Sequence, residues 1–289
     1  MDKPEPVYYQ PPNNHQTHLK GMFVWLTAIL SLAFIAVILA IIFARELAQL
    51  IPFSAEQRFV KPYETLAERF WDGEPGDPTV EAYLQQLADE LAFAMALPDD
   101  FEITVHYIDS PIENAFATLG GHLFLYRGML ESIDNENELS MVIAHELAHV
   151  RNRDPVVALG RGVALQLIYA FISGDYGSAD TLYSLGGELG LLFFSREQEQ
   201  QADLDAVDTL NAHYGHVTGH SGFFEKLLHI QSETEVEFPE WLATHPDLAN
   251  RIAAIQQHVD AANYARGDAT PLPASIIEAL ATSTIDVED

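Results

Sequence analysis

The longest apolar run of the chain lies close to its N-terminus. Residues Met22 to Ala44 read MFVWLTAILSLAFIAVILAIIFA, without a charged residue. At about 1.5 Å of rise per residue, a helix of this length spans the roughly 30 Å hydrocarbon core of a bilayer. The alternative is a cleaved secretory signal, but the run is longer than a signal core and no small-residue cleavage site follows it. We therefore predict a transmembrane anchor over residues 21–45, preceded by a polar tail over residues 1–20.

Helical spacing dominates the next segment, residues 46–98. One short helix is expected from Ser54, and a longer one from Pro78 to about Leu97, because proline suits a first helical turn. In the longer helix the apolar residues recur every three or four positions, at Val80, Tyr83, Leu84, Leu87 and Leu91. We predict a helical collar here, between the anchor and the main domain over residues 99–265.

The pattern becomes β-like between Phe101 and Leu130. The runs ITVHYI, AFATL and HLFLY are short and rich in β-branched and aromatic residues, and Pro111 and Gly120-Gly121 separate them. We predict a small sheet in this region.

Helical patterns return after the sheet. Asn135, with Glu138 three residues on, is typical of a capping box, and the apolar residues behind it share one helix face. Further helices are expected over about residues 179–212 and from Pro246 to about Ala262. The last segment, residues 266–289, contains two prolines and an acidic end, which predict a tail with at most one short helix.

A second apolar run extends from Val156 to Ile172 and can be interpreted in two ways. It is short for a membrane span and contains Arg161, whose charge would be costly at mid-bilayer. We therefore predict a buried core helix, with a membrane hairpin as the alternative.

Composition and charge exclude some classes of function. The chain has 14 basic and 43 acidic residues and a formal charge of -29. A nucleic-acid partner is not expected, because binding a phosphate backbone requires clustered Lys and Arg. The sequence contains no cysteine, so a bound metal must be held by histidines and carboxylates.

The segment HELAH, residues His145 to His149, has the spacing H-E-x-x-H. Residues four apart on a helix are separated by about 40° in projection, so both imidazoles face one point that can hold zinc. Glu146 lies about 100° round the helix from His145, where it can reach a zinc-activated water as general base without ligating the ion. The alternative is a solvated helix face, but three ionisable groups among buried apolar positions need a functional reason.

A catalytic zinc requires a third protein ligand. The segment SREQEQQAD, residues Ser195 to Asp203, contains Glu199 and Asp203 four residues apart on one helix face. Glu199 can bind the metal while Asp203 accepts the N–H of a ligating histidine. Glu197 lies about 160° round the helix from Glu199, so only one of the two can face the metal. We favour Glu199 because it shares its face with Asp203.

These motifs resemble a known family, the gluzincin peptidases that include HtpX and the CAAX prenyl proteases. The resemblance rests on HELAH, on SREQEQQAD, on NAFATLGGHLFLYRGML (residues 114–130) and on THPDLANRI (residues 244–252). It implies an α+β fold: a mainly helical, zincin-like metallopeptidase domain with a small sheet beside the active-site helix, here with one N-terminal transmembrane helix. With one convincing span, the chain is closer to the soluble or single-anchor branch than to the multi-span members.

The resemblance also implies roles for individual residues. His145, His149 and Glu199 match the ligands of one Zn²⁺ per chain, Glu146 the catalytic glutamate and Asp203 the aspartate behind a ligand. His245 matches a histidine near the metal, which would stabilise the oxyanion or occupy the open metal position as a gate. The alternative is that this histidine before a proline only begins a helix. An extended substrate would pair with an exposed strand, either residues 115–119 or 122–126. The candidate edge residues are Asn114, Ala115, Phe116 and Ala117.

The function predicted is that of a membrane-anchored zinc metalloendopeptidase in envelope protein quality control, acting on unfolded or damaged membrane or envelope proteins. Two alternatives remain. One is a latent protease gated by His245 with a chaperone-like or assembly role, and the other is a noncatalytic, zinc-containing binding module. The expected location is a bacterial inner membrane, crossed once. Basic residues are balanced on the two sides of the anchor, and we favour a periplasmic catalytic domain.

Overall fold

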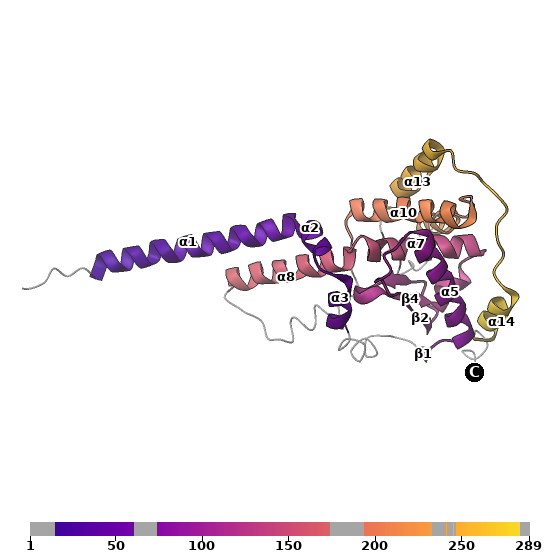
Figure 1. Ribbon diagram of the computed structural model, residues 1–289, viewed down its shortest axis with the longest axis horizontal. Helices are drawn as coiled ribbons and strands as arrows, with labels where there is room; N and C mark the ends of the chain where they lie inside the picture. Colours follow the sequence, from indigo (N-terminus) through magenta and orange to yellow (C-terminus); the bar gives the residue numbers. More distant parts are fainter. Residues whose placement is uncertain are drawn as a thin grey trace, which may run out of the picture.

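A long apolar helix projects from one end of the molecule (Figure 1). The computed structural model describes residues 15–60, 74–173, 194–232, 241, 245 and 247–283. Helix α1 spans His15–Ile42, and α2 (Ala44–Gln49) and α3 (Phe53–Val60) lead from it to the body of the protein.

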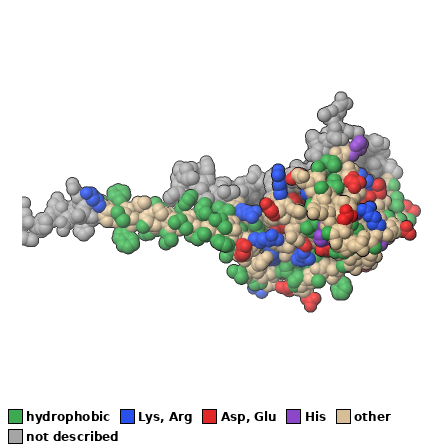
Figure 2. Space-filling model, turned by 90° about the horizontal axis from the view of Figure 1, so that it is seen from above, with side chains coloured by type: hydrophobic (Ala, Val, Ile, Leu, Met, Phe, Trp, Pro, Cys, Tyr) green, Lys and Arg blue, Asp and Glu red, His purple; other side chains and the backbone are tan. Residues whose placement is uncertain are grey.

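Among the described residues, one helix is long and apolar enough to cross a membrane, Leu19–Ile42, and it falls on the predicted anchor. None of this span is buried inside the protein, and Figure 2 shows hydrophobic side chains along the projecting helix. A helix that is apolar on all sides needs apolar surroundings, which here come from outside the chain. This agrees with a single-pass anchor.

The predicted small sheet is confirmed and has four strands in the order β1-β2-β4-β3. The inner strands β2 (Thr104–Asp109) and β4 (His122–Tyr126) run parallel, while β3 (Ala115–Ala117) pairs antiparallel with β4. Strand β1 (Glu74–Pro75), which the sequence did not suggest, pairs antiparallel with β2. Strand β4 is therefore interior, and the possibility that residues 122–126 form the open edge is wrong.

The central helix is α7 (Glu136–Arg151), which lies between the sheet and α10 (Arg196–Tyr214) (Figure 1). The Asn135 side chain accepts the Glu138 N–H at 3.0 Å, which is the predicted N-cap. Every residue from Asn137 to Val150 is buried, because α5 (Pro78–Ala94) also packs on α7. The position of the metal-binding motif in the core follows from this packing.

Helix α10 begins later than the sequence suggested. Its N-cap is Ser195, whose side chain accepts the Gln198 N–H while Gln198 accepts the Ser195 N–H, a complete capping box. The helix starts at Arg196 and ends at Gly215, whose φ of 74° suits a left-handed C-cap. Most of the predicted stretch before Ser195 lies outside the described residues.

Helix α8 (Asp154–Ser173) runs beside α1 instead of entering the core (Figure 1). Near its start, Val156 and Val157 pack against Ala44 and Ala48 of α2. Further along, Val163 is 37% exposed. The start of α8 therefore does not join the main core, because its buried Val157 belongs to a separate small cluster with α2. The prediction of a buried core helix is wrong for this part of α8.

Several shorter helices complete the domain: α6 (Arg127–Glu131), the 3₁₀ turn η1 (Leu119–Gly121), α11 (Gly222–Ser232), α13 (Leu248–Ala262) and α14 (Ala274–Ser283). The main hydrophobic core takes side chains from α5, which lies in the predicted collar, and from α14, which lies in the predicted tail. The divisions at residues 98 and 265 stay proposals.

Candidate metal centre

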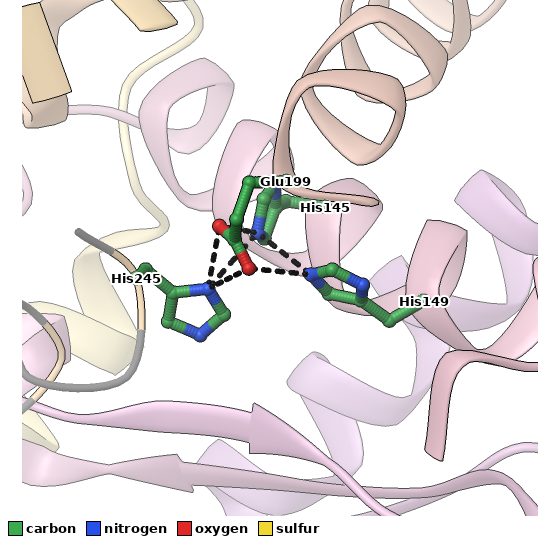
Figure 3. A group of neighbouring side chains, drawn as sticks. All are labelled: His145, His149, Glu199 and His245. Carbon is green, nitrogen blue, oxygen red and sulfur yellow. Dashed lines mark hydrogen bonds and ion pairs between the residues drawn. The ribbon is translucent and has the colours of Figure 1, made fainter. Parts of the chain in front are cut away.

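His145 and His149 lie on successive turns of α7 and face one point (Figure 3). Both side chains are fully buried. Their Nε2 atoms are 3.1 Å apart. The helical spacing of the motif thus brings two imidazoles together inside the protein.

The outer nitrogen of each imidazole faces a carboxylate. His145 Nδ1 lies 3.0 Å from Oδ1 of Asp203, and His149 Nδ1 lies 2.9 Å from Oδ2 of Asp154. The contact of His149 with Asp154 has hydrogen-bond geometry, and that of His145 with Asp203 is an ion-pair contact. A carboxylate in this position favours the proton on Nδ1, which leaves the lone pair of the ring on Nε2, directed at the shared point. The two rings are therefore oriented as metal ligands.

Glu199 supplies a third donor from the first turn of α10, which the Ser195 capping box holds in place. Its oxygens lie 3.6 Å from His145 Nε2 and 3.5 Å from His149 Nε2. Three electron-pair donors thus converge on one buried point, an arrangement that a shared cation or proton satisfies. Two imidazoles and one carboxylate are a set that zinc prefers, so the residues present fit this metal.

Glu146 lies beside this group without joining it. Its Oε2 accepts the Ala117 N–H at 2.8 Å, which ties α7 to strand β3. Its Oε1 is buried and has no hydrogen-bond partner among the residues that the structure describes. One oxygen of this carboxylate is anchored, and the other remains able to accept a proton.

His245 adds a fourth side chain to the cluster. Together with His145, His149 and Glu199 it forms a buried group whose potential ligand atoms all lie within 4.8 Å of one another. Its Nδ1 is 2.9 Å from Glu199 Oε2, and its ring stacks on Trp241 at 4.4 Å. This nitrogen can either donate to Glu199 or bind a shared metal.

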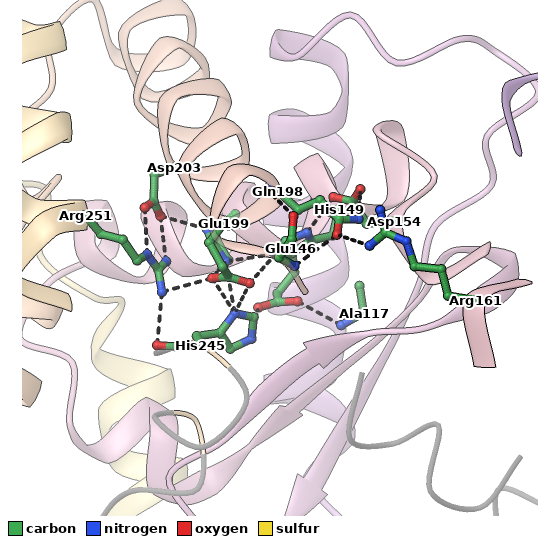
Figure 4. A network of polar contacts seen from close by, with 12 residues as sticks. Ala117, Glu146, His149, Asp154, Arg161, Gln198, Glu199, Asp203, His245 and Arg251 are labelled. Carbon is green, nitrogen blue, oxygen red and sulfur yellow. Dashed lines mark hydrogen bonds and ion pairs between the residues drawn. The ribbon is translucent and has the colours of Figure 1, made fainter. Parts of the chain in front are cut away.

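Arg251, on α13, is a central residue that the sequence reasoning did not identify (Figure 4). Its guanidinium donates to both Asp203 oxygens at 2.7 Å and lies 3.0 Å from Glu199 Oε2. Four buried carboxylates surround the cluster, namely Glu146, Asp154, Glu199 and Asp203, and they carry more negative charge than one divalent cation balances. Arg251 supplies one further positive charge. This imbalance of charge implies a buried cation, and the sequence has few basic residues that could supply it. A buried arginine could therefore have been predicted.

The electrostatics of the cluster follow from these pairs. Burial alone would raise the pKa of Asp203, but Arg251 outweighs it and lowers that pKa. Burial lowers the pKa of His145, while its hydrogen bonds to Asp203 and Glu199 raise it to about 9. Without a metal, a proton is therefore held where the cation would lie, and metal binding must release it.

Asp154 and Gln198 also escaped the sequence reasoning. Gln198 donates from Nε2 to Asp154 Oδ1 at 2.5 Å, and Arg161 donates to Gln198 Oε1 at 3.2 Å (Figure 4). These bonds fix the carboxylate that orients His149. The only local signal was the position of Asp154, at the start of the next helix.

Strand β3 is the open edge of the sheet nearest the cluster. Phe116 pairs with Phe124 of β4, and the bonds from Thr118 N to His122 O and from Tyr126 N to Asn114 O flank that pair. By antiparallel alternation, the backbone N–H groups of Ala115 and Ala117 point away from β4. The four predicted edge residues thus lie on or beside β3, with Ala117 in contact with Glu146.

Comparison with known proteins gives a consistent set of relatives. Residues 78–259 match the model of peptidase family M48. The mitochondrial metalloendopeptidase OMA1 of Danio rerio is 29% identical over 228 residues, covering 74% of this chain and 46% of the relative. The β-barrel assembly-enhancing protease of Yersinia pestis is 28% identical over 206 residues (65% and 42%), and that of Escherichia coli K12 is 29% identical over 189 residues (61% and 38%). The chain spans less than half the length of these relatives.

Proposed function

The chain belongs to peptidase family M48, and from this premise we propose that it is a membrane-anchored, zinc-dependent metalloendopeptidase. His145, His149 and Glu199 would hold one Zn²⁺ per chain. The observation that carries the proposal is the convergence of these three donors beside an unbonded oxygen of Glu146. Bound zinc would supply Lewis acidity toward a water and toward the scissile carbonyl.

Glu146 is the general base and acid in this proposal. Its Oε1 would take a proton from the attacking water and pass it to the leaving amine. The bond from Ala117 N–H to Oε2 supports this role, because it holds the carboxylate in one orientation while Oε1 stays available. Asp203 and Asp154 would keep both histidine ligands in the tautomer that zinc requires.

The substrate would bind as an extended strand along β3. Ala115 and Ala117 direct their backbone groups to the side of β3 that no strand covers. Both residues are buried and the Ala117 N–H is bonded to Glu146, so a peptide would pair with the remaining backbone groups of β3, next to Glu146. Such pairing recognises backbone, and we expect a broad side-chain preference. The substrate class would be unfolded or damaged membrane and envelope proteins.

One relative is named as a mitochondrial metalloendopeptidase and another as a β-barrel assembly-enhancing protease, and from this likeness we propose a role in protein quality control. For this chain we propose a bacterial inner membrane, crossed once by α1, with the catalytic domain on the periplasmic side. The excess of acidic residues gives no support to a nucleic-acid partner.

One observation favours a second candidate, a latent protease with a chaperone-like or assembly role. His245 Nδ1 lies 2.9 Å from Glu199 and 3.3 Å from His145 Nε2, close enough to bind the same cation. A fourth protein ligand would occupy the position that the water needs. His245 would then gate the site.

The test uses the full chain in detergent, with unfolded casein as substrate and zinc content measured in every sample. We compare the parent with Glu146→Gln, with His245→Ala and with Glu197→Gln, which removes an exposed carboxylate from the same turn as Glu199. The proposal expects cleavage by the parent and by Glu197→Gln, and a loss of about 1,000-fold or more in Glu146→Gln with zinc retained.

Two other outcomes would overturn the leading proposal. An inactive parent with full zinc, together with an active His245→Ala variant, would establish the latent protease. Full zinc without cleavage by any variant would leave the noncatalytic binding module.

A further inference from the structure

Helix α3, which lies between the membrane anchor and the peptidase domain, contacts residues next to the candidate site through one buried carboxylate. Glu56 of α3 is 7% exposed, although acidic residues are rarely buried without a partner. Its Oε1 accepts the Gly120 N–H at 2.7 Å, and its Oε2 lies 2.5 Å from Nη1 of Arg153. Both partners are close in sequence to residues of the candidate site.

Resting on the proposed function, we infer that Glu56 is a positioning residue of the peptidase and that α3 is part of its active site. Its contact with Gly120 fixes the position of strand β3, and its contact with Arg153 fixes the orientation of the Asp154 carboxylate that contacts His149. The membrane anchor is thereby connected to both halves of the site.

The first connection runs to the substrate edge. Gly120 belongs to η1, directly after β3, and has a φ of 80°. Gly121 beside it fits closely against α3, since an added Cβ would lie 2.9 Å from the Phe53 ring. Fixing this turn fixes the end of β3, where Ala117 donates to Glu146.

The second connection runs to a metal ligand. Arg153 has a φ of 63°, which residues other than glycine seldom adopt. Its side chain is held against the start of α3: Nη2 donates to Ile51 O, just before the helix, at 2.8 Å, and the guanidinium lies 5.5 Å from the Phe53 ring. Asp154 is the next residue, so this turn of the backbone directs its carboxylate back to His149.

The chemistry of the pair indicates a geometric role. Burial raises the pKa of Glu56, while the Gly120 hydrogen bond and the Arg153 charge oppose that rise. A buried ion pair is weak evidence for stability, because apolar side chains of similar volume often pack as well. What apolar side chains cannot provide is a fixed acceptor for Gly120 and a fixed partner for Arg153.

The experiment separates the two connections by comparing two substitutions of Glu56 in the full chain in detergent. Glu56→Gln keeps an acceptor for the Gly120 N–H but loses the charge pair with Arg153, whereas Glu56→Ala loses both. Glu102→Gln is the matched control, because it removes an exposed carboxylate near the same junction. The readouts are KM and kcat on an unfolded-casein peptide, and zinc affinity by competition with a chelator.

We expect zinc affinity to fall about threefold to tenfold in both Glu56 variants, below the 10- to 100-fold range of a direct ligand partner. KM should stay near the parent value in Glu56→Gln and rise about tenfold in Glu56→Ala. Glu102→Gln should match the parent. A change in melting temperature alone, with zinc affinity and KM like those of the control, would overturn the inference.

Two further arms keep the test decisive. If Glu56→Ala does not fold, the test relies on Glu56→Gln and Arg153→Met, each of which must lower the zinc affinity. The variant that carries both substitutions must then lose no more zinc affinity than the more affected of the two single variants. Additive losses would contradict a shared pathway. If the parent shows no Glu146-dependent cleavage, the proposed function fails, while zinc competition still decides whether Glu56 positions the metal site.

Discussion

Helices α1 and α7 are both rich in apolar residues, yet their surroundings are opposite. From Met22 onward α1 has no ionisable side chain, and its apolar residues are exposed. Helix α7 is buried almost throughout, and its core-facing residues include His145, Glu146 and His149. Exposed apolar side chains indicate that lipid must surround α1. The buried ionisable side chains of α7 indicate that side chains from other elements, together with a metal, must balance their charge.

The largest expected effect tests how the charges around α7 are balanced. Arg251→Met removes the cation that pairs with Asp203 and Glu199 but keeps similar volume. Leaving two buried carboxylates without it should lower the free energy of unfolding of the zinc-free protein by about 3–5 kcal/mol. Denaturant unfolding measures this, with the exposed Arg266→Met as control. A loss below about 1 kcal/mol would show that the carboxylates do not depend on Arg251.

A smaller effect is expected in α1, where the surroundings come from outside the chain. Ile35→Arg places a charge near the middle of the span, which should disfavour membrane insertion by about 2.5–3.5 kcal/mol. The matched control is Ile277→Arg on α14, which is also an exposed isoleucine but outside the span. The measurement is the fraction of protein that resists alkaline extraction from membranes. Equal extraction of the two variants would contradict a spanning α1.

The smallest effect concerns a half-buried histidine outside the cluster, His106. Burial, together with the neighbouring His122, lowers the pKa of His106 to about 4. The unfolded chain binds this proton near pH 6.5, so the stability contribution is present above pH 6.5 and is lost as the pH falls toward 4. Allowing for partial exposure, the loss is on the order of 2 kcal/mol.

His106→Phe should therefore reduce the decrease in unfolding free energy between pH 7 and pH 4.5. Unfolding curves at the two pH values check this, and an unchanged difference would assign the acid sensitivity to other groups. The result would distinguish two cases: a histidine whose pKa is lowered because it is shielded from water, and the histidines of α7, whose rings contact carboxylates.

Local patterns predicted much of the fold. The Asn135 cap, the H-E-x-x-H spacing and the four-residue step from Glu199 to Asp203 all act within one or two helical turns, so the sequence displays them directly. The anchor followed from length and composition in the same way.

The features that escaped prediction depend on distant parts of the chain. Arg251 meets Asp203 only because α13 packs on α10, and nothing in its own helix identifies those carboxylates as its partners. Helix α8 was misplaced because its apolar run fits a protein core as well as it fits the side of α2. Likewise, which strand forms the open edge depends on pairing order, which alternating hydrophobicity does not encode.

The cap of α10 has a consequence for how this chain can be altered. Ser195 and Gln198 close the start of the helix by themselves, and Glu199 is the next residue. Because the capping box sets the residue at which the helix begins, the number of residues that precede it need not affect the direction in which Glu199 points. A reporter peptide could therefore be spliced in upstream of Ser195, and homologous chains could differ there in length, without moving the third ligand out of phase.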